Sequence, residues 1–500
     1  MSLDRRDFLR SAAFASGTWV LGSWPEGAEA LGLDQPQWPK NTFLEGNFAP
    51  VHEEVTADDL RVIGKLPKEL DGMFVRNGPN PMFPPRGNYH WFDGDGMLHG
   101  VRLRDGKASY RNRYVQTASW QAEKQAGKAI YTGMMDPPAA PLVKNAPRHN
   151  KANTALVWHN RKLLALWEGG PPWEVKLPGL ETVAECRFGG KLRHSFTAHP
   201  KVDPATGEML CFGYNMVSKP HLFYSVINPQ GEITHATPID LPRGVMMHDF
   251  AITAQHSIFM DLPETFDMKR AMSGKHPLVF RADLPSRFGI LPRHGAAKEI
   301  KWFESPSCFV FHVLNAYDEG DDVVLQACRY NRFPDLVDFE KLTQGTGSKK
   351  AEPLTSKLYQ WRFNLKTGAV KEGPLDDRDA EFPRINEALT GRKTRYGYAG
   401  GGGDFFGQFH KHDFVKGTTE VHAFGKGRNG GEGVFVPAPD ARAEDDGWLM
   451  TYVHDTATDK SELILVDCRD FQKSPIARIL LPQRVPYGFH GLWVDGKQLA

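Results

Sequence analysis

Four histidines lie in short apolar segments typical of β-strands, and imidazole is a strong ligand for transition metals. They are His199 in FTAHPKVD, His248 in MMHDFAIT, His312 in CFVFHVLNAY and His490 in PYGFHGLWV. Four neutral imidazoles that converge on one point would bind a divalent metal such as iron, copper, nickel or zinc, whereas calcium and magnesium prefer oxygen ligands. The four are separated by 49, 64 and 178 residues, so no zinc-finger or HExxH spacing explains them.

The four histidines form one site only if the fold aims several strands at one axis. The chain has 19 histidines, and a single histidine on an apolar strand is more often a hydrogen-bonded core residue than a ligand. A fold of repeated sheets around an axis would supply one ligand from each sheet. The metal site is therefore a hypothesis about the architecture as much as about the residues.

Short β segments joined by tight turns dominate the chain after residue 50. Turns at Asp105-Gly106 and at Asn160 predict hairpins, and 49 glycines and 36 prolines are typical of a turn-rich all-β protein. The length favours a propeller, since blades of roughly 40–50 residues or more would make the 49- and 64-residue spacings about one blade each and the 178-residue spacing about three blades. Two helical insertions, residues 118–131 and 333–347, could cap one face. We expect one domain over residues 31–500.

Composition and charge exclude several classes of protein. Lys+Arg 61 against Asp+Glu 60 gives a net charge of +1, without the basic excess that nucleic-acid binding requires. Hydrophobic residues make up 40% of the chain, which predicts a globular core. The five cysteines have no CxxC spacing, so we expect buried thiols, with a single disulfide as the alternative.

The N-terminus resembles an export signal. Arg5 and Arg6 form a twin-arginine pattern before the apolar stretch SAAFASGTWVLGSW, and Ala28-Glu29-Ala30 supplies a cleavage site. The apolar run is too short and broken for a membrane span. We predict a signal peptide over residues 1–30, the twin-arginine machinery as a partner and a periplasmic protein that begins near Leu31. An ordinary basic amphipathic helix is the alternative.

Several segments together resemble the carotenoid cleavage oxygenases, the family that includes lignostilbene dioxygenases and the animal retinoid isomerohydrolase. DGMFVRNGPNP and HWFDGDGMLHG are similar to its N-terminal signatures, and the four histidine segments resemble those that carry its iron ligands. The resemblance covers nearly all of residues 31–500. It implies a seven-bladed β-propeller with Fe(II) on the axis, a small helical or loop cap over the metal-bearing face, and His199, His248, His312 and His490 as the ligands.

The same resemblance implies three glutamates that support the ligands. They match Glu168 in LLALWEGG, Glu381 in EFPRIN and Glu432 in GEGVFVPAPD, with Glu387 as an alternative to Glu381. A metal-bound imidazole usually donates its other N–H to a carboxylate, which fixes the tautomer. The family commonly has proline where this chain has Gly433, so the match is least complete at Glu432.

The resemblance also implies an activity. An Fe(II)-dependent dioxygenase would insert both atoms of O₂ into a C=C bond of a small apolar conjugated alkene, such as a carotenoid or apocarotenoid, and release two carbonyl products. A lysine typically precedes the first glutamate in lignostilbene dioxygenases, but here that residue is Trp167. This difference favours the bacterial apocarotenoid-oxygenase branch. The alternatives are a lignostilbene-type dioxygenase, an isomerase-hydrolase on the same scaffold and a propeller that only binds a partner or a polyene.

An apolar cavity would have to hold such an alkene beside the metal. Aromatic residues that flank the site residues are its predicted lining: Trp167, Phe196, Phe311 and Phe489. Because polyenes reside in membranes, we also predict peripheral membrane contact at residues 134–138 or 288–292. A partly buried loop is the alternative for both segments.

Overall fold

The computed structural model describes residues 37–134, 136, 139–273, 277–334, 354–402 and 405–499. The predicted signal peptide lies outside this range, and so does nearly all of the predicted helix over residues 333–347. Residues 38–500 make one compact unit. In the described part of the chain, no helix has the length and apolar character needed to cross a membrane.

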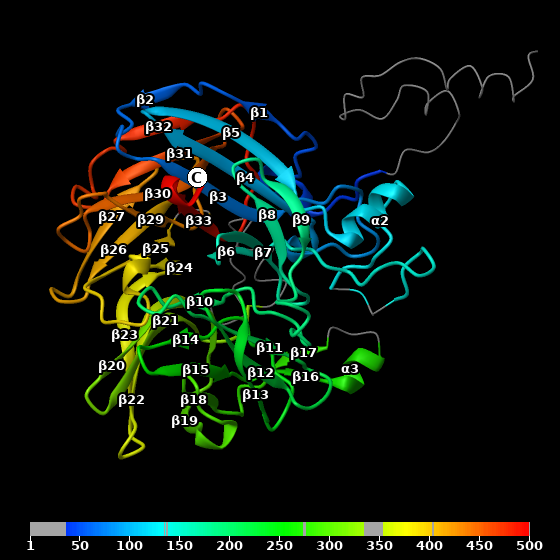
Figure 1. The fold of residues 1–500 in the computed structure, drawn as a ribbon, viewed down its shortest axis with the longest axis vertical. Coiled ribbons are helices and arrows are strands. Elements are labelled where there is room, and N and C mark those ends of the chain that lie inside the picture. Colours follow the sequence, from blue (N-terminus) through cyan, green and yellow to red (C-terminus); the bar gives the residue numbers. More distant parts are fainter. Residues whose placement is uncertain are drawn as a thin grey trace, which may run out of the picture. The chain divides into compact units, whose positions relative to one another are not determined.

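Seven antiparallel sheets form the blades of a β-propeller, as the sequence predicted. Figure 1 shows them around a common centre, with β6, β24 and β33 toward the middle and β13, β19 and β27 toward the rim. The second and third blades contain β6 (Ala155–His159), β7 (Lys162–Leu166), β8 (Trp173–Lys176) and β9 (Glu181–Glu185), then β10 (Lys201–Val202), β11 (Met209–Tyr214), β12 (Leu222–Ile227) and β13 (Ile233–Ile239).

The next three blades repeat this order from the centre outward. Between β15 and β18 the fourth blade carries an additional hairpin, β16 (Glu264–Phe266) and β17 (Leu278–Phe280). The three blades are β14 (Ala251–Ile252), β15 (His256–Asp261), β18 (Ser286–Pro292) and β19 (Lys301–Ser305); β20 (Phe309–Glu319), β21 (Asp322–Tyr330), β22 (Ser356–Asn364) and β23 (Val370–Asp379); β24 (Glu381–Arg384), β25 (Tyr396–Gly401), β26 (Gln408–Asp413) and β27 (Thr418–Ala423).

The first and last blades combine strands from both ends of the chain and close the ring. The C-terminal strand β33 pairs with β3 from Gly72↔Asp495 to Arg76↔Gly491, and β2 pairs with β32. The first blade is β1 (Thr56–Ala57), β5 (Lys107–Tyr114), β4 (Gly96–Arg104), β3 (Gly72–Pro79) and β33 (Gly491–Asp495); the last is β2 (Val62–Gly64), β32 (Ala477–Leu480), β31 (Lys460–Asp467), β30 (Gly447–Asp455), β28 (Arg428–Asn429) and β29 (Val434–Pro437).

Residue pattern explains which strands lie inside. β3 is buried at every residue, whereas β5 alternates between buried and more exposed residues, as expected when one sheet face points to solvent. The predicted hairpins are present. Asp105 and Gly106 have φ values of 52° and 73°, which match a type I′ turn between β4 and β5. Asn160 and Arg161 also have positive φ values, between β6 and β7.

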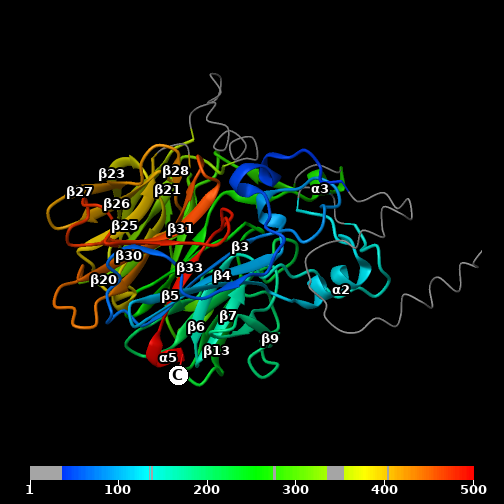
Figure 2. The same ribbon diagram turned by 90° about the horizontal axis from the view of Figure 1, so that it is seen from above.

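Helices are few and short in the residues that the structure describes. The predicted insertion at residues 118–131 is helical only at α2 (Ala118–Ala126), which begins at the Thr117 cap and ends at Gly127 with φ 67°. Figures 1 and 2 show α2 and α3 toward one side of the molecule, away from β26 and β27. The remaining helices are α3 (Met268–Met272), α5 (Gly496–Leu499) and the 3₁₀ turns η2 (Thr42–Leu44), η3 (Gly46–Phe48), η4 (Trp91–Asp93), η5 (Ala297–Glu299) and η6 (Glu387–Leu389).

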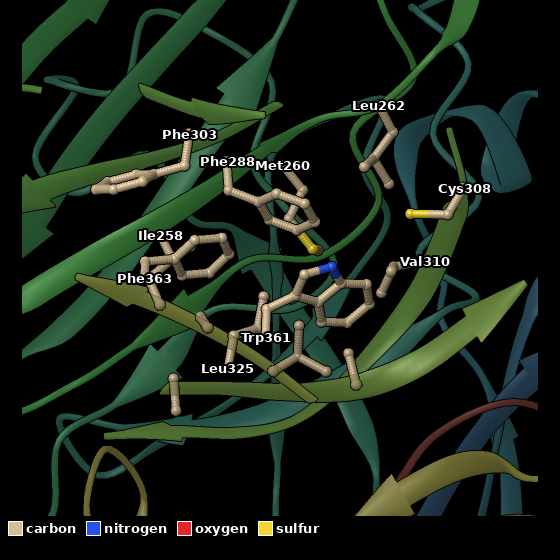
Figure 3. Packing of buried hydrophobic residues seen from close by; sticks show 14 of the residues in the cluster. Ile258, Met260, Leu262, Phe288, Phe303, Cys308, Val310, Leu325, Trp361 and Phe363 are labelled. Atoms are coloured by element: carbon tan, nitrogen blue, oxygen red, sulfur yellow. The ribbon is translucent and has the colours of Figure 1, made fainter. Parts of the chain in front are cut away.

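The interior between the fourth and fifth blades contains the largest hydrophobic cluster. Figure 3 shows Trp361 of β22 among Met260, Phe288, Val310 and Leu325, which come from strands of both blades. The Trp361 indole N–H donates to Ser305 Oγ at 3.1 Å, so its polar atom is paired although the side chain is fully buried. All five cysteines are free thiols, and four of them are buried, as predicted.

The segment over residues 288–292 is interior, which corrects a prediction. It belongs to β18, where the exposed fractions of Phe288, Ile290 and Leu291 are 0%, 1% and 0%. The apolar run is therefore a core strand that cannot contact a membrane.

Removing the Trp361 side chain should destabilise the propeller strongly. A Trp361→Ala variant is expected to lose about 3–5 kcal/mol in the free energy of unfolding, because it leaves a large cavity in this packed cluster. Urea denaturation of the metal-free protein would measure the loss. The control is Val415→Ala, where the side chain is 73% exposed and the change should stay within about 0.5 kcal/mol. Equal effects at both residues would contradict this packing.

Candidate metal centre

The innermost strands of the blades bring the four histidines together. His199, His248 and His490 each lie one to three residues before an innermost strand, β10, β14 and β33, and His312 lies within β20. One ligand atom from each residue falls within 4.8 Å of the others. Ring closure contributes directly here, since the pairing of β33 with β3 and the hydrogen bond from the Asn77 N–H to the His490 carbonyl hold His490 beside the other ligands.

Three of the histidines hydrogen-bond to the three predicted glutamates. The Nδ1 atoms of His248, His312 and His490 lie 2.7, 2.5 and 2.9 Å from carboxylate oxygens, and a carboxylate can only accept, so each Nδ1–H donates. The fixed tautomer leaves each Nε2 lone pair free to bind a metal. The partners are Glu168 for His248, Glu381 for His312 and Glu432 for His490.

The metal-binding nitrogen atoms face one another with lone pairs, an arrangement that a cation between them would stabilise. His199 Nε2 and His248 Nε2 lie 3.0 Å apart, and His312 Nε2 is buried without a hydrogen-bond partner. A cation between the four rings would use all of these lone pairs. Four imidazoles suit iron, copper, nickel or zinc.

The surrounding charges also favour a cation. Three carboxylates lie behind the histidines, and the guanidinium of Arg384, which lies close to them, is shared between Glu432 at 3.2 Å and Glu387. A bound cation would compensate the excess of negative charge. Buried charge without such compensation would be strongly destabilising.

Electrostatics keep two of the ligands neutral. Burial lowers the pKa of His199 well below its ordinary value, and the neighbouring His490, His248 and His312 lower it further. Burial also lowers the pKa of His490 to about 4, although Glu432 acts in the opposite direction. Neutral imidazole is the form that binds metal.

Glu432 and His312 respond to their partners rather than to burial. Burial would raise the pKa of Glu432, but Arg384 and then His490 outweigh it and lower the pKa to about 2. Burial would lower the pKa of His312, but the charge and hydrogen bond of Glu381 outweigh it, and the pKa is raised. His312 therefore holds a proton more readily than an ordinary imidazole does. Metal binding must displace that proton, so the affinity for the metal falls in acid.

A cavity of about 690 Å³ lies against the metal-binding atoms of His248, His312 and His490. This volume is within the range of about 300–1,000 Å³ that is usual for ligand sites. Aromatic side chains dominate its lining: Phe43, Phe48, Trp91, Phe92, Trp167, Phe223, Phe311, Phe382, Phe405, Phe406 and Phe489. The 3₁₀ turns η2, η3 and η4 supply part of this cover, so the predicted cap consists mainly of loops and short turns.

Three of the four aromatic residues predicted to line the cavity do so, and one does not. Trp167, Phe311 and Phe489 face it, whereas Phe196 is 1% exposed and stacks on Phe188 in the hydrophobic core. The prediction for Phe196 is wrong because its ring packs into a core cluster with Phe188, Met209 and Cys211. Glu387, the alternative to Glu381, is exposed and pairs with Arg384 instead of a histidine.

Two supporting residues escaped sequence reasoning. Tyr214 O–H donates to Glu168 Oε1 at 2.8 Å, and Arg384 contacts Glu432. Arg384 is part of the EFPRIN segment, so its motif could have drawn attention to it. Tyr214 lies on β11 with no distinguishing pattern around it.

Comparisons with known proteins agree with this geometry. The sequence model of the family described as Retinal pigment epithelial membrane protein matches residues 48–495. A carotenoid 9,10(9′,10′)-cleavage dioxygenase 1 of Pisum sativum is 42% identical, over 91% of this chain and 90% of that protein. A carotenoid cleavage oxygenase of Mycobacterium tuberculosis is 36% identical, over 91% and 97%.

Two solved structures share the fold. The lignostilbene dioxygenase of Pseudomonas brassicacearum superposes with a TM-score of 0.84 at 32% identity, over 92% of this chain and all of that chain. The cobalt-substituted ACO of Synechocystis superposes with a TM-score of 0.80 at 29% identity, over 89% and 97%.

Removing one carboxylate should weaken metal binding without removing a ligand. Glu381→Gln is expected to lower the affinity for Co(II) about 10–100-fold, because the amide no longer accepts the His312 N–H as a charged partner. Competition with a chromophoric chelator would measure it. Glu387→Gln is the matched control, six residues away and without contact to a ligand, and it should change little. Equal losses in both variants would refute the assignment.

Proposed function

This chain belongs to the carotenoid cleavage oxygenase family, and we propose that it uses Fe(II) to cleave the 9,10 and 9′,10′ double bonds of a carotenoid or apocarotenoid. The protein is a dioxygenase that cleaves conjugated C=C bonds. The observation that carries the proposal is the four-histidine cluster with its three carboxylates at the inner end of an aromatic cavity.

The choice of bond rests on the sequence relatives. Proteins of Pisum sativum, Crocus sativus and Arabidopsis thaliana that carry the 9,10(9′,10′) name are 42%, 42% and 41% identical over 91% of this chain. The bacterial apocarotenoid-oxygenase branch suggested by Trp167 stays a prediction. An apocarotenoid substrate would differ from the carotenoid of the plant relatives in the length of its polyene. The cavity must accommodate that polyene on both sides of the bond that is cleaved.

The residues of this chain position and shield the reacting bond. Bound Fe(II) would supply the redox chemistry that lets dioxygen react with an alkene. Phe311 and Phe489 flank the ligands and line the cavity, where their ring faces can hold a planar polyene in one orientation. Both oxygen atoms enter the products and the alkene supplies the electrons, so no nicotinamide or flavin is required.

A lignostilbene-type activity is the second candidate, favoured by the TM-score of 0.84 with the Pseudomonas enzyme. A phenol would need a polar partner in the cavity. Lys151 is the buried ammonium there, but it already pairs with Asp93, and its Nζ lies 5.8 Å from the centre of the Trp167 ring. Most of the lining is aromatic and suits a long apolar polyene, while Arg148, Thr154 and Tyr330 also line the cavity and keep the stilbene activity as the second candidate.

Product analysis under ¹⁸O₂ tests the proposal. Incubation of the Fe(II)-loaded protein with a carotenoid, an apocarotenal and a hydroxystilbene should give labelled carbonyl fragments of the 9,10 cleavage, identified by mass. The His312→Ala variant should bind no iron and form no products. The substitution removes one metal ligand and also the imidazole N–H that donates to Glu381. Labelled hydroxybenzaldehydes alone would favour the stilbene activity. Unlabelled, isomerised product would favour an isomerase-hydrolase.

We also propose that the protein is exported through the twin-arginine pathway and acts in the periplasm. The support is the Arg5-Arg6 pattern, the apolar stretch and the Ala28-Glu29-Ala30 site. Peripheral membrane contact is part of the same proposal. Met134 and Val217 line the cavity and are 39% and 60% exposed, so an apolar rim is available where a polyene would enter.

Replacing both arginines tests export. Twin-arginine signals are read by their receptor as an address, so Arg5→Lys with Arg6→Lys should block export of the full chain. Cell fractionation and immunoblotting would show the uncleaved precursor in the cytoplasm instead of the mature protein in the periplasm. Arg10→Lys is the control in the same segment. Equal fractionation of all three proteins would contradict the proposal.

A further inference from the structure

A second cavity, which we name the axial cavity, lies on the other side of the four histidines. Its volume is about 330 Å³. His199 lines only the axial cavity, His248 lines only the aromatic cavity, and His312 and His490 line both. A metal held by the four rings would therefore separate two spaces, of which the substrate needs only one.

The innermost strands form the wall of the axial cavity. Residues of β6, β10, β14, β20, β24 and β33 that follow the metal-binding segments line it. At its far end the lining includes Pro204, Glu387 and Gln498, which are exposed. The cavity thus extends along the propeller axis from the ligands to a solvent-accessible end.

The axial cavity is polar where the other is aromatic. It contains the ion pair of Lys201 with Asp249 at 2.8 Å, and Arg384 between Glu432 and Glu387. Three carboxylates against two cationic groups give its lining a net negative charge. A negative wall raises the local concentration of cations, and its oxygen atoms can replace water around an entering ion.

In the aromatic cavity the carboxylates of the lining, Glu168 and Glu381, are those already hydrogen-bonded to His248 and His312. The charged groups elsewhere on its wall are the cations of Arg148, Lys151 and Arg193. Moving a hydrated divalent ion through an apolar space costs far more than moving it past carboxylates, because the lost hydration is not compensated. Substrate and metal therefore need opposite environments to reach the same point. The two cavities provide one environment each.

We propose that the divalent metal enters its four-histidine site through the axial cavity and not through the aromatic cavity. The inference rests on the proposed metal role of the histidines. Thr390 and Glu387 are the residues that control this route. Thr390 is half-buried in the lining, with its hydroxyl donating to the Glu387 carbonyl at 2.9 Å, and neither side chain contacts a ligand.

Uptake kinetics of Co(II) by the metal-free protein test the route. Thr390→Phe should narrow the axial cavity and slow the uptake of Co(II). The rate would then be set by local opening of the protein. Visible absorption of bound Co(II) gives the rate, and elemental analysis gives the final content. The final content, and turnover after Fe(II) loading, should equal those of the unmodified protein. Thr458→Phe, on an exposed turn away from both cavities, should leave the rate unchanged.

Charge and location provide two further variants. Glu387→Lys should slow uptake about tenfold at low salt, with the difference shrinking as salt rises, while Glu304→Lys on the exposed face of β19 should not. Val217→Trp narrows the aromatic cavity and should leave uptake unchanged while reducing turnover of the polyene.

Two results would overturn the inference, and they are distinguishable. Unchanged uptake in both Thr390→Phe and Glu387→Lys, or slow uptake in Val217→Trp, would show that the axial cavity is not the route. No bound Co(II) in the unmodified protein would instead remove the metal role of the four histidines, and with it the proposed function.

Discussion

Closure of the ring by the last strand is the constraint on which the metal centre depends. β33 pairs with β3 over five residue pairs, and this pairing brings His490 to the three other ligands, which precede it by 178 residues or more. In the neighbouring blade, β2 from the N-terminal half pairs with β32, so each closing blade contains strands from both ends of the chain. A propeller that opened at this seam would lose one of four ligands and the partner of Glu432 together.

The three carboxylates then orient three of the histidines, so that each Nε2 lone pair is available to the metal. Each fixes one tautomer, but their own partners differ: Tyr214 donates a neutral hydroxyl to Glu168, the Phe382 N–H donates to Glu381, and Arg384 neutralises Glu432. His490 therefore shares its carboxylate with a cation, whereas His312 does not, and their pKa values shift in opposite directions. The ligands are chemically unequal although all four are imidazoles.

Sequence reasoning succeeded where a motif fixes a local environment and failed where the partner comes from another blade. The four histidines and three glutamates lie in recognisable segments. The Asp105-Gly106 pair predicts its own turn, because its residue types favour the positive φ values that the turn needs. Tyr214 has no local signal, because its role is set by the distance to Glu168 across two blades. Phe288 to Pro292 illustrates a second limit, since an apolar run looks the same in a buried strand as in an exposed apolar loop.

The placement of the ligands at the beginnings of the innermost strands separates two tasks. Loops and turns build most of the aromatic cavity, with strand residues such as Phe311 and Phe382, whereas the innermost strands line most of the axial cavity. Loops can change without moving the strands, so the shape of the substrate cavity can vary while the metal centre and its polar side stay fixed. A lignostilbene dioxygenase can therefore superpose with a TM-score of 0.84 on a chain whose sequence relatives are named for carotenoids. The shared fold and the four-histidine site go with the cleavage of conjugated C=C bonds, and under the proposed function the lining of the aromatic cavity would select the alkene.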